Sequence, residues 1–325
     1  ALRRRVPVGL ARFGGWIALS VMPLAAALLA AGHLPTLSYA TVLPFVIGVT
    51  VLGVLAAVPL QRFGTSVPTA VLGVAVLAYF VVEAALGWTA ALTPFLGGSE
   101  LDGGRFYGLP NVFIGLLVGC ALFVAVRLPA VTGWLLVIAV GLFAGLPFAG
   151  ANLGASVTLF AAAGIWLAVR GWDRPGWRPI LTAIATVAVG TALVLLAHRF
   201  LTSAPTHVTR FEETAGRSVS GVWGTVIDRF LVGWHLIVRN PFALVPVLGV
   251  PLTLLAALRP PAMVRTAFER HPRLRDAIVV TLVAGLVAVL PNDSWPAAMG
   301  LSFALGLGGL VHVSLAPRTG MMGEP

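Results

Sequence analysis

The sequence predicts an all-α protein, a polytopic transmembrane helical bundle of about ten spans. Hydrophobic residues make up 58% of the 325 residues and charged residues only 10%, whereas soluble domains carry roughly 25% charged residues. The mean hydropathy is +0.98. Apolar runs long enough to cross a bilayer as helices recur along the whole sequence. We therefore expect a single integral membrane domain over 1–325.

Ten apolar runs, separated by more polar segments, define the expected spans. They cover 13–34, 40–60, 67–87, 111–127, 129–148, 153–169, 180–198, 241–258, 277–291 and 295–315. Three connections are longer than a tight turn. They are an outer loop at 88–110, an outer segment at 199–239 and a cytoplasmic basic loop at 259–276.

The distribution of arginine sets the expected orientation. All 21 basic residues are arginines. With the N-terminus in the cytoplasm, 15 of them fall on the cytoplasmic side and 6 on the outer side, as the positive-inside rule requires. Both termini are therefore expected in the cytoplasm. The net charge of +10 then belongs to loops that touch lipid headgroups, and a nucleic-acid partner is excluded.

The absence of lysine bears on the source of the protein. Alanine, glycine, valine and arginine are abundant instead, a bias that suggests a GC-rich bacterial genome. The expected location is a bacterial cytoplasmic (inner) membrane, with membrane lipids as partners.

The outer segment 199–239 contains a helical pattern in its second half. Apolar residues recur there at helical spacing, namely Val219, Val222, Val226, Phe230 and Trp234. Polar residues fall elsewhere, among them Asp228, Arg229, His235 and Arg239. This pattern predicts an amphipathic helix at 218–239, either lying in the outer membrane interface or packed on the protein's own spans. Residues 199–239 are also the candidate surface for protein partners.

All four asparagines lie where a span begins on the outer side: Asn111, Asn152, Asn240 and Asn292. Helix capping explains each one singly. Because helix N-termini expose unpaired N–H groups and the positive end of the helix dipole, several gathered together predict an anion-attracting rim. Asn111 and Asn292 have charged neighbours, and Asn152 lies in a tight apolar return where it needs partners. Asn240 is followed only by a proline and is expected to be a plain cap.

The polar stretch 100–111 precedes the fourth span. Within it, Arg105 can hold a phosphate or carboxylate through two hydrogen bonds, and Tyr107 offers a ring and a hydroxyl group. The alternative is an ordinary loop in which Asp102 pairs with Arg105 and Tyr107 belongs to the interfacial aromatic belt.

Two further carboxylates join Asp102 as candidate catalytic residues. Asn292, Asp293 and Ser294 are all good caps, and three in a row exceed what one helix needs, which makes Asp293 the strongest candidate. Glu83 lies inside the third span, where a carboxylate is costly. It could pair with Arg105, serve as a protonation site, or lie close enough to the interface to reach water.

Metal and cofactor motifs are not found. His198, His207 and His235 are expected on the outer side but lack metal-ligand spacing, and Cys120 is expected to be a small buried residue. The sequence contains no HExxH, paired CxxC or catalytic serine elbow. We therefore expect no metal and no cofactor, and whether the protein is an enzyme stays open.

Three stretches resemble the motifs of an uncharacterised family of bacterial polytopic membrane proteins. They are GRFYGLPNVFIGLLVG, LPFAGANLGASVTLF and LPNDSWPAAMG, in the family's order from about residue 100 onward. The family pattern is G-R-[FY]-Y-G-x-x-N-E, P-x-x-G-A-N and F-N-D-S-G, and some members are associated with an alkaline-phosphatase-like extracytoplasmic domain. This chain has Val112 in place of Glu and Trp295 in place of Gly. The resemblance implies an envelope setting and a shared outer-face site, although the loss of an acidic residue at 112 weakens any inherited acid–base role.

Three functions fit these features. In the first, the outer polar site binds an anionic, phosphate-bearing lipid or lipid-linked envelope precursor. Arg105 would hold the anion, helped by the N–H groups near Asn111, Asn152 and Asn292, while Asp102 and Asp293 would orient it or act as a base. The second is a transporter or channel for a small solute or ion, and the third is a structural or anchoring subunit of a larger complex.

Overall fold

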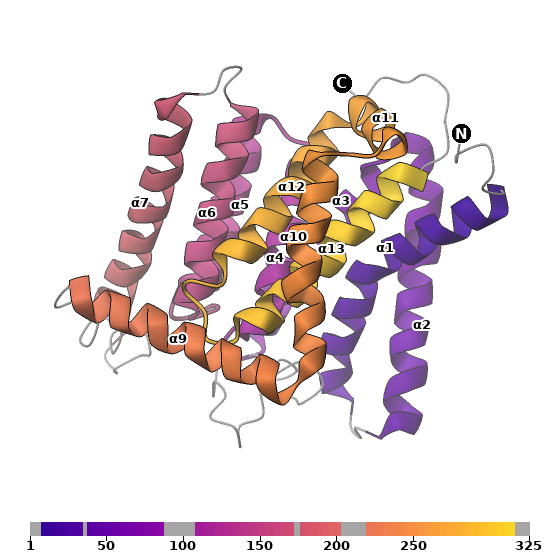
Figure 1. Cartoon of the computed structure of the whole chain (residues 1–325). Coiled ribbons are helices and arrows are strands. Elements are labelled where there is room, and N and C mark those ends of the chain that lie inside the picture. The colour runs from indigo at the N-terminus through magenta and orange to yellow at the C-terminus, as the bar shows by residue number, and fades with distance from the viewer. Residues whose placement is uncertain (1–7, 35–37, 88–107, 172–175, 203–218, 316–325) are drawn as a thin grey trace.

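In a computed structural model, the protein is a bundle of α-helices (Figure 1). The structure describes residues 8–34, 38–87, 108–171, 176–202 and 219–315. Within these ranges, ten helices run alternately down and up the bundle. They are α1 (Val8–Ala30), α2 (Tyr39–Ala57), α3 (Val67–Ala85), α4 (Ile114–Ala125), α5 (Ala130–Gly145), α6 (Leu153–Arg170), α7 (Trp177–Leu201), α10 (Leu244–Leu258), α12 (Pro272–Val287) and α13 (Trp295–Leu315).

Each of the ten predicted spans falls on one of these helices. Short 3₁₀ turns extend four of them: η2 (Ala31–His33), η3 (Val58–Phe63), η5 (Asn111–Phe113) and η6 (Pro241–Ala243). Seven of the described helices are long and apolar enough to cross a membrane, namely α1, α2, α3, α6, α7, α10 and α13. The chain is therefore an all-helical protein that fits the multi-pass membrane class. Crossing by α4, α5 and α12 stays a prediction, since they have 12, 16 and 16 residues and a span needs about 20.

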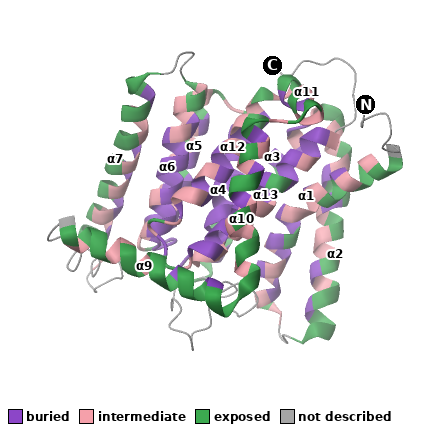
Figure 2. Cartoon of the chain, viewed as in Figure 1, coloured by how far each residue is buried: buried purple, intermediate pink, exposed green. Residues whose placement is uncertain are grey.

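Helix α4 forms the centre of the bundle. Every α4 residue except Val124 is buried, because α3, α5, α12 and α13 all pack against it. Figure 2 shows this buried centre, with α2, α7 and α9 largely exposed around it. A helix that is apolar all round is stable only when other helices or lipid cover every face, so the innermost helix is also the most uniformly apolar one.

A short helix, α11 (Ala262–Arg270), lies at the upper end of the bundle in Figure 1. The prediction of a basic loop at 259–276 is therefore wrong in part, because α11 and the first turns of α12 occupy most of it. The helix forms because Ala267 and Phe268 are buried against the bundle while its arginines stay outside. Basic character and helical structure are compatible when one face is apolar.

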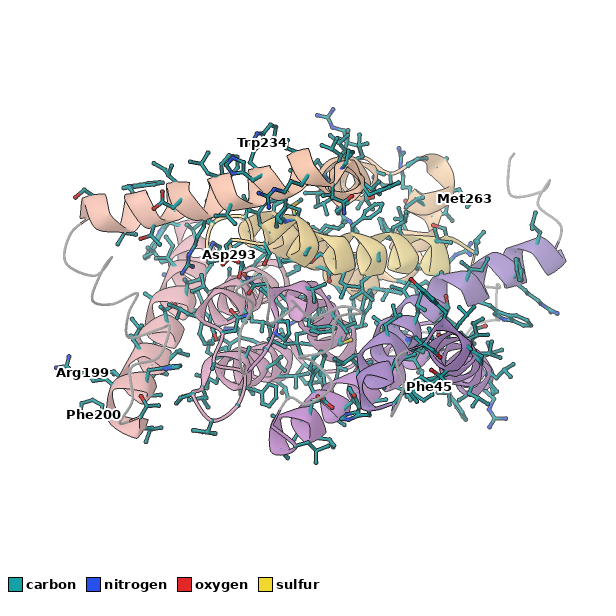
Figure 3. The ribbon with its side chains drawn as sticks, turned by 90° about the horizontal axis from the view of Figure 1, so that it is seen from below. Phe45, Arg199, Phe200, Trp234, Met263 and Asp293 are labelled. Carbon is teal, nitrogen blue, oxygen red and sulfur yellow. The ribbon has the colours of Figure 1, made fainter. Side chains whose placement is uncertain are left out.

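At the opposite, lower end, α9 (Val219–Arg239) lies crosswise beneath the bundle (Figure 1). It contacts α13, and Gly233 and Ile237 are buried. Trp223 and Trp234 are 61% and 49% exposed, and Figure 3 shows Trp234 on the side of α9 away from the bundle. The predicted amphipathic helix is present, and it packs on the protein along one face while leaving large apolar side chains uncovered.

Candidate functional site

Three chain returns meet at the lower end of the bundle. They precede α4, α6 and α13, and they carry Asn111, Asn152 and the run Asn292-Asp293-Ser294. Helix α9 adds Arg229 from below. We call these six residues the lower polar cluster.

Asn152 is the buried hub of this cluster. Its side chain is 0% exposed, and its Oδ1 accepts the Ala155 N–H at 3.0 Å, which caps α6. Its Nδ2 donates to the Leu109 carbonyl and to Asn111 Oδ1, both at 2.8 Å. A buried amide without partners would be costly. Here both polar atoms of the side chain are hydrogen-bonded: Oδ1 caps α6, and Nδ2 joins this return to the one before α4.

Asn111 connects that hub to the third return. Its Nδ2 donates to Asp293 Oδ1 at 2.6 Å and to Ser294 Oγ at 2.8 Å. Its side chain makes no capping bond to η5, for which Pro110 is the N-cap residue. The capping interpretation of Asn111 is therefore wrong, because its amide bridges two other returns.

Asn292 likewise does not cap the helix that follows it. Its Nδ2 donates backward to the Ala288 carbonyl at 2.9 Å, which satisfies the end of α12, and the residue is 2% exposed. Its Oδ1 lies against Gly154 so closely that a Cβ there would overlap it. The absence of a side chain at Gly154 thus lets the return before α13 seat on the first turn of α6.

Asp293 and Arg229 supply the charges of the cluster. Asp293 is exposed, and its Oδ1 accepts the Ser294 N–H at 2.7 Å in addition to the Asn111 amide. The Arg229 guanidinium donates to the Pro291 carbonyl. Burial lowers the pKa of Arg229, and the negative charge of Asp293 opposes that shift. Because arginine is not deprotonated in proteins, the site holds a permanent cation that interacts electrostatically with the Asp293 carboxyl group.

Trp295 fixes α9 to this site. Its indole N–H donates to the Phe230 carbonyl at 3.3 Å, and the two rings stack with centroids 5.7 Å apart. The ring also covers Gly233, where a Cβ would overlap it. Figure 3 shows Asp293 on the bundle side of α9. Trp295 therefore holds α9 against the return before α13.

Asn240 lies apart from the cluster, as expected. Its Oδ1 accepts the Phe242 N–H at 3.2 Å, and the residue is exposed at the start of η6. Of the four asparagines, only Asn152 and Asn240 cap the elements they precede. The gathering of three helix starts is thus visible in the contacts, whereas a binding role for them stays a prediction.

Glu83 forms a second polar group near the end of α3. Its side chain is 0% exposed and pairs with His33 Nε2, while the Tyr79 hydroxyl donates to Glu83 Oε1 at 3.1 Å. The expectation that Glu83 reaches water is wrong, because neighbouring helices enclose it. Its other two interpretations, a protonation site and a partner of Arg105, stay predictions.

Several predicted residues lie outside the described part of the chain. Asp102, Arg105 and Tyr107 belong to the predicted outer loop 88–110, of which the structure describes only 108–110. His207 falls in the undescribed 203–218. Among the described histidines, His198 Nε2 donates to the Gly145 carbonyl at 2.8 Å, and His235 is exposed. No group of three or more metal-ligating side chains occurs in the residues that the structure describes.

Arg229 is the cluster residue that sequence reasoning missed. The helical pattern placed it away from the apolar stripe, yet it faces the bundle. A usable signal was its spacing of four residues from Gly233 and eight from Ile237, since residues four apart share one helix face. Small residues on that face indicate close packing.

Comparison with known proteins gives no match to a family model, a curated protein or a solved structure. The function must therefore be argued from the site itself.

Proposed function

We propose that this protein is a multi-pass protein of a bacterial cytoplasmic membrane, and that its lower polar cluster binds an anionic, phosphate-bearing lipid or lipid-linked envelope precursor at the outer face. The observation that carries the proposal is the hydrogen-bonded series Asn152–Asn111–Asp293. It joins three helix starts in one place, beside the guanidinium of Arg229.

The arginines of the described residues support this orientation. Ten lie at the upper end of the bundle: Arg12, Arg62, Arg127, Arg170, Arg178, Arg259, Arg265, Arg270, Arg273 and Arg275. Three lie at the lower end: Arg199, Arg229 and Arg239. Under the positive-inside rule, the upper end is cytoplasmic and the polar cluster faces the outer side. Ten crossings with both termini inside then follow from the alternating helices.

The chemistry of the cluster favours a phosphate-bearing ligand. Arginine presents a planar fork of donors that matches phosphate oxygens, and helix starts add N–H groups and a favourable dipole. Arg105 precedes Asn111 by six residues and would supply a second cation. Asp293 orients the donors around it, because it accepts hydrogen bonds from the Asn111 amide and the Ser294 N–H.

Lipid binding by arginine variants tests this proposal. The purified protein is placed in phosphatidylcholine nanodiscs, and retention of added phosphatidylglycerol is measured by native mass spectrometry. Removing a charge-assisted hydrogen bond costs about 1.5 to 3 kcal/mol, so Arg229→Ala and Arg105→Ala should each weaken binding by roughly tenfold or more. Arg239→Ala is the matched control, because it removes the same charge from an exposed position of α9. Equal losses of phosphatidylglycerol binding in all three variants would show that only general electrostatic attraction holds the lipid, and would rule out a specific site at the cluster.

A second candidate, an anchoring subunit, is favoured by the exposed apolar side chains of α9. Trp223, Ile227 and Val238 are 61%, 54% and 65% exposed. Such a face suits a membrane surface or a partner protein. Stoichiometric co-purification of a partner that is lost in Trp223→Ala would favour this function over lipid binding.

A further inference from the structure

An apolar groove of about 370 Å³ lies between α3, α4 and α5. Helix α4 packs against both of the others and lies between them. The lining side chains are all apolar: Val74, Leu77, Ala78, Phe80, Val81, Leu117, Val124, Leu136, Ala139, Val140 and Phe143. Val74 and Val81 are 53% and 57% exposed, so the groove is open along its outer side.

The groove has the width of a single extended chain. Its lining covers 74–81 of α3, 117–124 of α4 and 136–143 of α5, which is about 10 Å of each helix at 1.5 Å per residue. A volume of about 370 Å³ over that length leaves a cross-section of about 37 Å². The groove therefore has room for an extended alkyl chain along this length.

The groove lies near the middle of the bundle's height. Its lining straddles the midpoints of α3 and α4 and extends from the middle of α5 toward the lower end of that helix. A polar solute would find no hydrogen-bonding side chain there. A hydrocarbon chain would bury apolar surface on three sides without that cost.

The lower rim of the groove adjoins the lower polar cluster. Phe80 lines the groove, and its ring packs at 5.7 Å on Phe113, two residues after Asn111. Phe143 also lines the groove, and its carbonyl accepts the Gly150 N–H at 2.9 Å within the return that carries Asn152. These contacts link the groove to the returns that carry the cluster, so an amphiphile with its chain in the groove would have its polar end on the side of the cluster.

We propose that the groove between α3, α4 and α5 holds an acyl chain of a phospholipid whose phosphate lies at the lower polar cluster. This inference rests on the proposed function and extends it, because it assigns the ligand to the phospholipids and places its tail. Ala78 and Ala139 are both exposed in the groove, and their small size leaves the space that the chain occupies.

Photolabelling of the full chain tests the inference. Phosphatidylglycerol carrying a diazirine on one acyl chain is added to the protein in phosphatidylcholine nanodiscs, and labelled peptides are mapped by mass spectrometry. We expect label in 74–81 and 136–143 that excess unlabelled phosphatidylglycerol removes. Ala139→Phe places a ring in the groove and should lower that labelling by about tenfold, since displacing two methylene groups is worth about that much. Ala185→Phe, at an exposed position of α7, is the matched control and should change it less than about twofold.

The outcomes separate this inference from the proposed function. If Arg229→Ala weakens phosphatidylglycerol binding while Ala78→Phe and Ala139→Phe leave binding and labelling unchanged, the polar site stands and the groove is not its tail site. Label spread evenly over α2, α7 and the groove, without competition, would mean ordinary boundary lipid and overturn the inference. If a phosphatidylcholine probe labels the groove as strongly as the phosphatidylglycerol probe, with no effect of Arg229→Ala, then labelling of the groove does not depend on headgroup binding at the cluster. That result would overturn the inference as well.

Discussion

Replacing Asn152 with alanine removes the side chain that joins the returns before α4 and α6. The amide makes three hydrogen bonds, to the Ala155 N–H, the Leu109 carbonyl and Asn111 Oδ1. Asn152 is the N-cap residue of α6 and has an extended backbone (φ −116°, ψ 95°), a conformation that alanine also adopts. The expected loss therefore comes from the three broken bonds rather than from altered helix propensity.

The size of that loss can be built from the environments of the three partners. Losing the cap at the Ala155 N–H costs about 1 kcal/mol. Leu109 is 0% exposed, so its carbonyl loses a bond that water does not readily replace, at about 2 kcal/mol. Asn111 is only half-buried, and its oxygen can turn to water at little cost. The expected destabilisation by Asn152→Ala is thus about 3 kcal/mol.

Asn240→Ala is a matched comparison, because it makes the same change at the exposed cap of η6. Its expected cost is about 1 kcal/mol or less. Thermal unfolding of the detergent-purified variants, followed by tryptophan fluorescence, measures both. At roughly 2 to 4 °C per kcal/mol, Asn152→Ala should melt at least about 6 °C below the parent and Asn240→Ala within a few degrees of it. Equal shifts would refute the view that the amide of Asn152 ties the returns together.

Two further changes probe the neighbours of the cluster. Gly233→Ala places a methyl group into the Trp295 ring and should destabilise the docking of α9 by about 1 to 3 kcal/mol, which a change in tryptophan emission would report. Gly224→Ala is the control, because a Cβ there meets nothing, and it should stabilise α9 by up to about 1 kcal/mol. If Gly233→Ala also stabilised the protein, the packing of Trp295 on Gly233 would be contradicted. Glu83→Ala should lower the melting temperature more than Glu83→Gln, because glutamine keeps an acceptor for the Tyr79 hydroxyl. An unpaired buried group costs about 1 to 3 kcal/mol. Equal melting temperatures would show that this hydrogen bond adds nothing to the stability of the protein.

The helices were predictable wherever an apolar run has sharp polar limits. The sixth predicted span, 153–169, matches α6 (Leu153–Arg170) because Asn152 and Arg170 bound it on both sides. Helix α11 was missed because only two of its residues, Ala267 and Phe268, are buried. Two buried residues in nine give too little periodicity to separate a short helix from a basic loop.

The gathering of helix starts was also predictable in outline, because alternating spans bring every outward return to the same end. The hydrogen bonds were not. Asn111 and Asn292 have the sequence context of caps, yet their amides donate to Asp293 and to the Ala288 carbonyl. The Asn292 amide makes a local bond back to the helix before it, a pattern that competes with capping of the next helix. The partner of Asn111 lies in a return 182 residues away in the sequence, and local spacing carries no information about the distance between those returns.

The return at 291–295 connects the polar cluster to α9. Asp293 accepts from Asn111 on the bundle side, while the Pro291 carbonyl accepts from Arg229 and Trp295 covers Gly233 on the α9 side. Moving α9 away from the bundle would expose the Trp295 ring, which is 4% exposed, and would separate Arg229 from Asp293. The cation of the site and the exposed apolar surface of α9 therefore move together. A phosphate held by Arg229 would strengthen the docking of α9, since a ligand stabilises the arrangement that binds it.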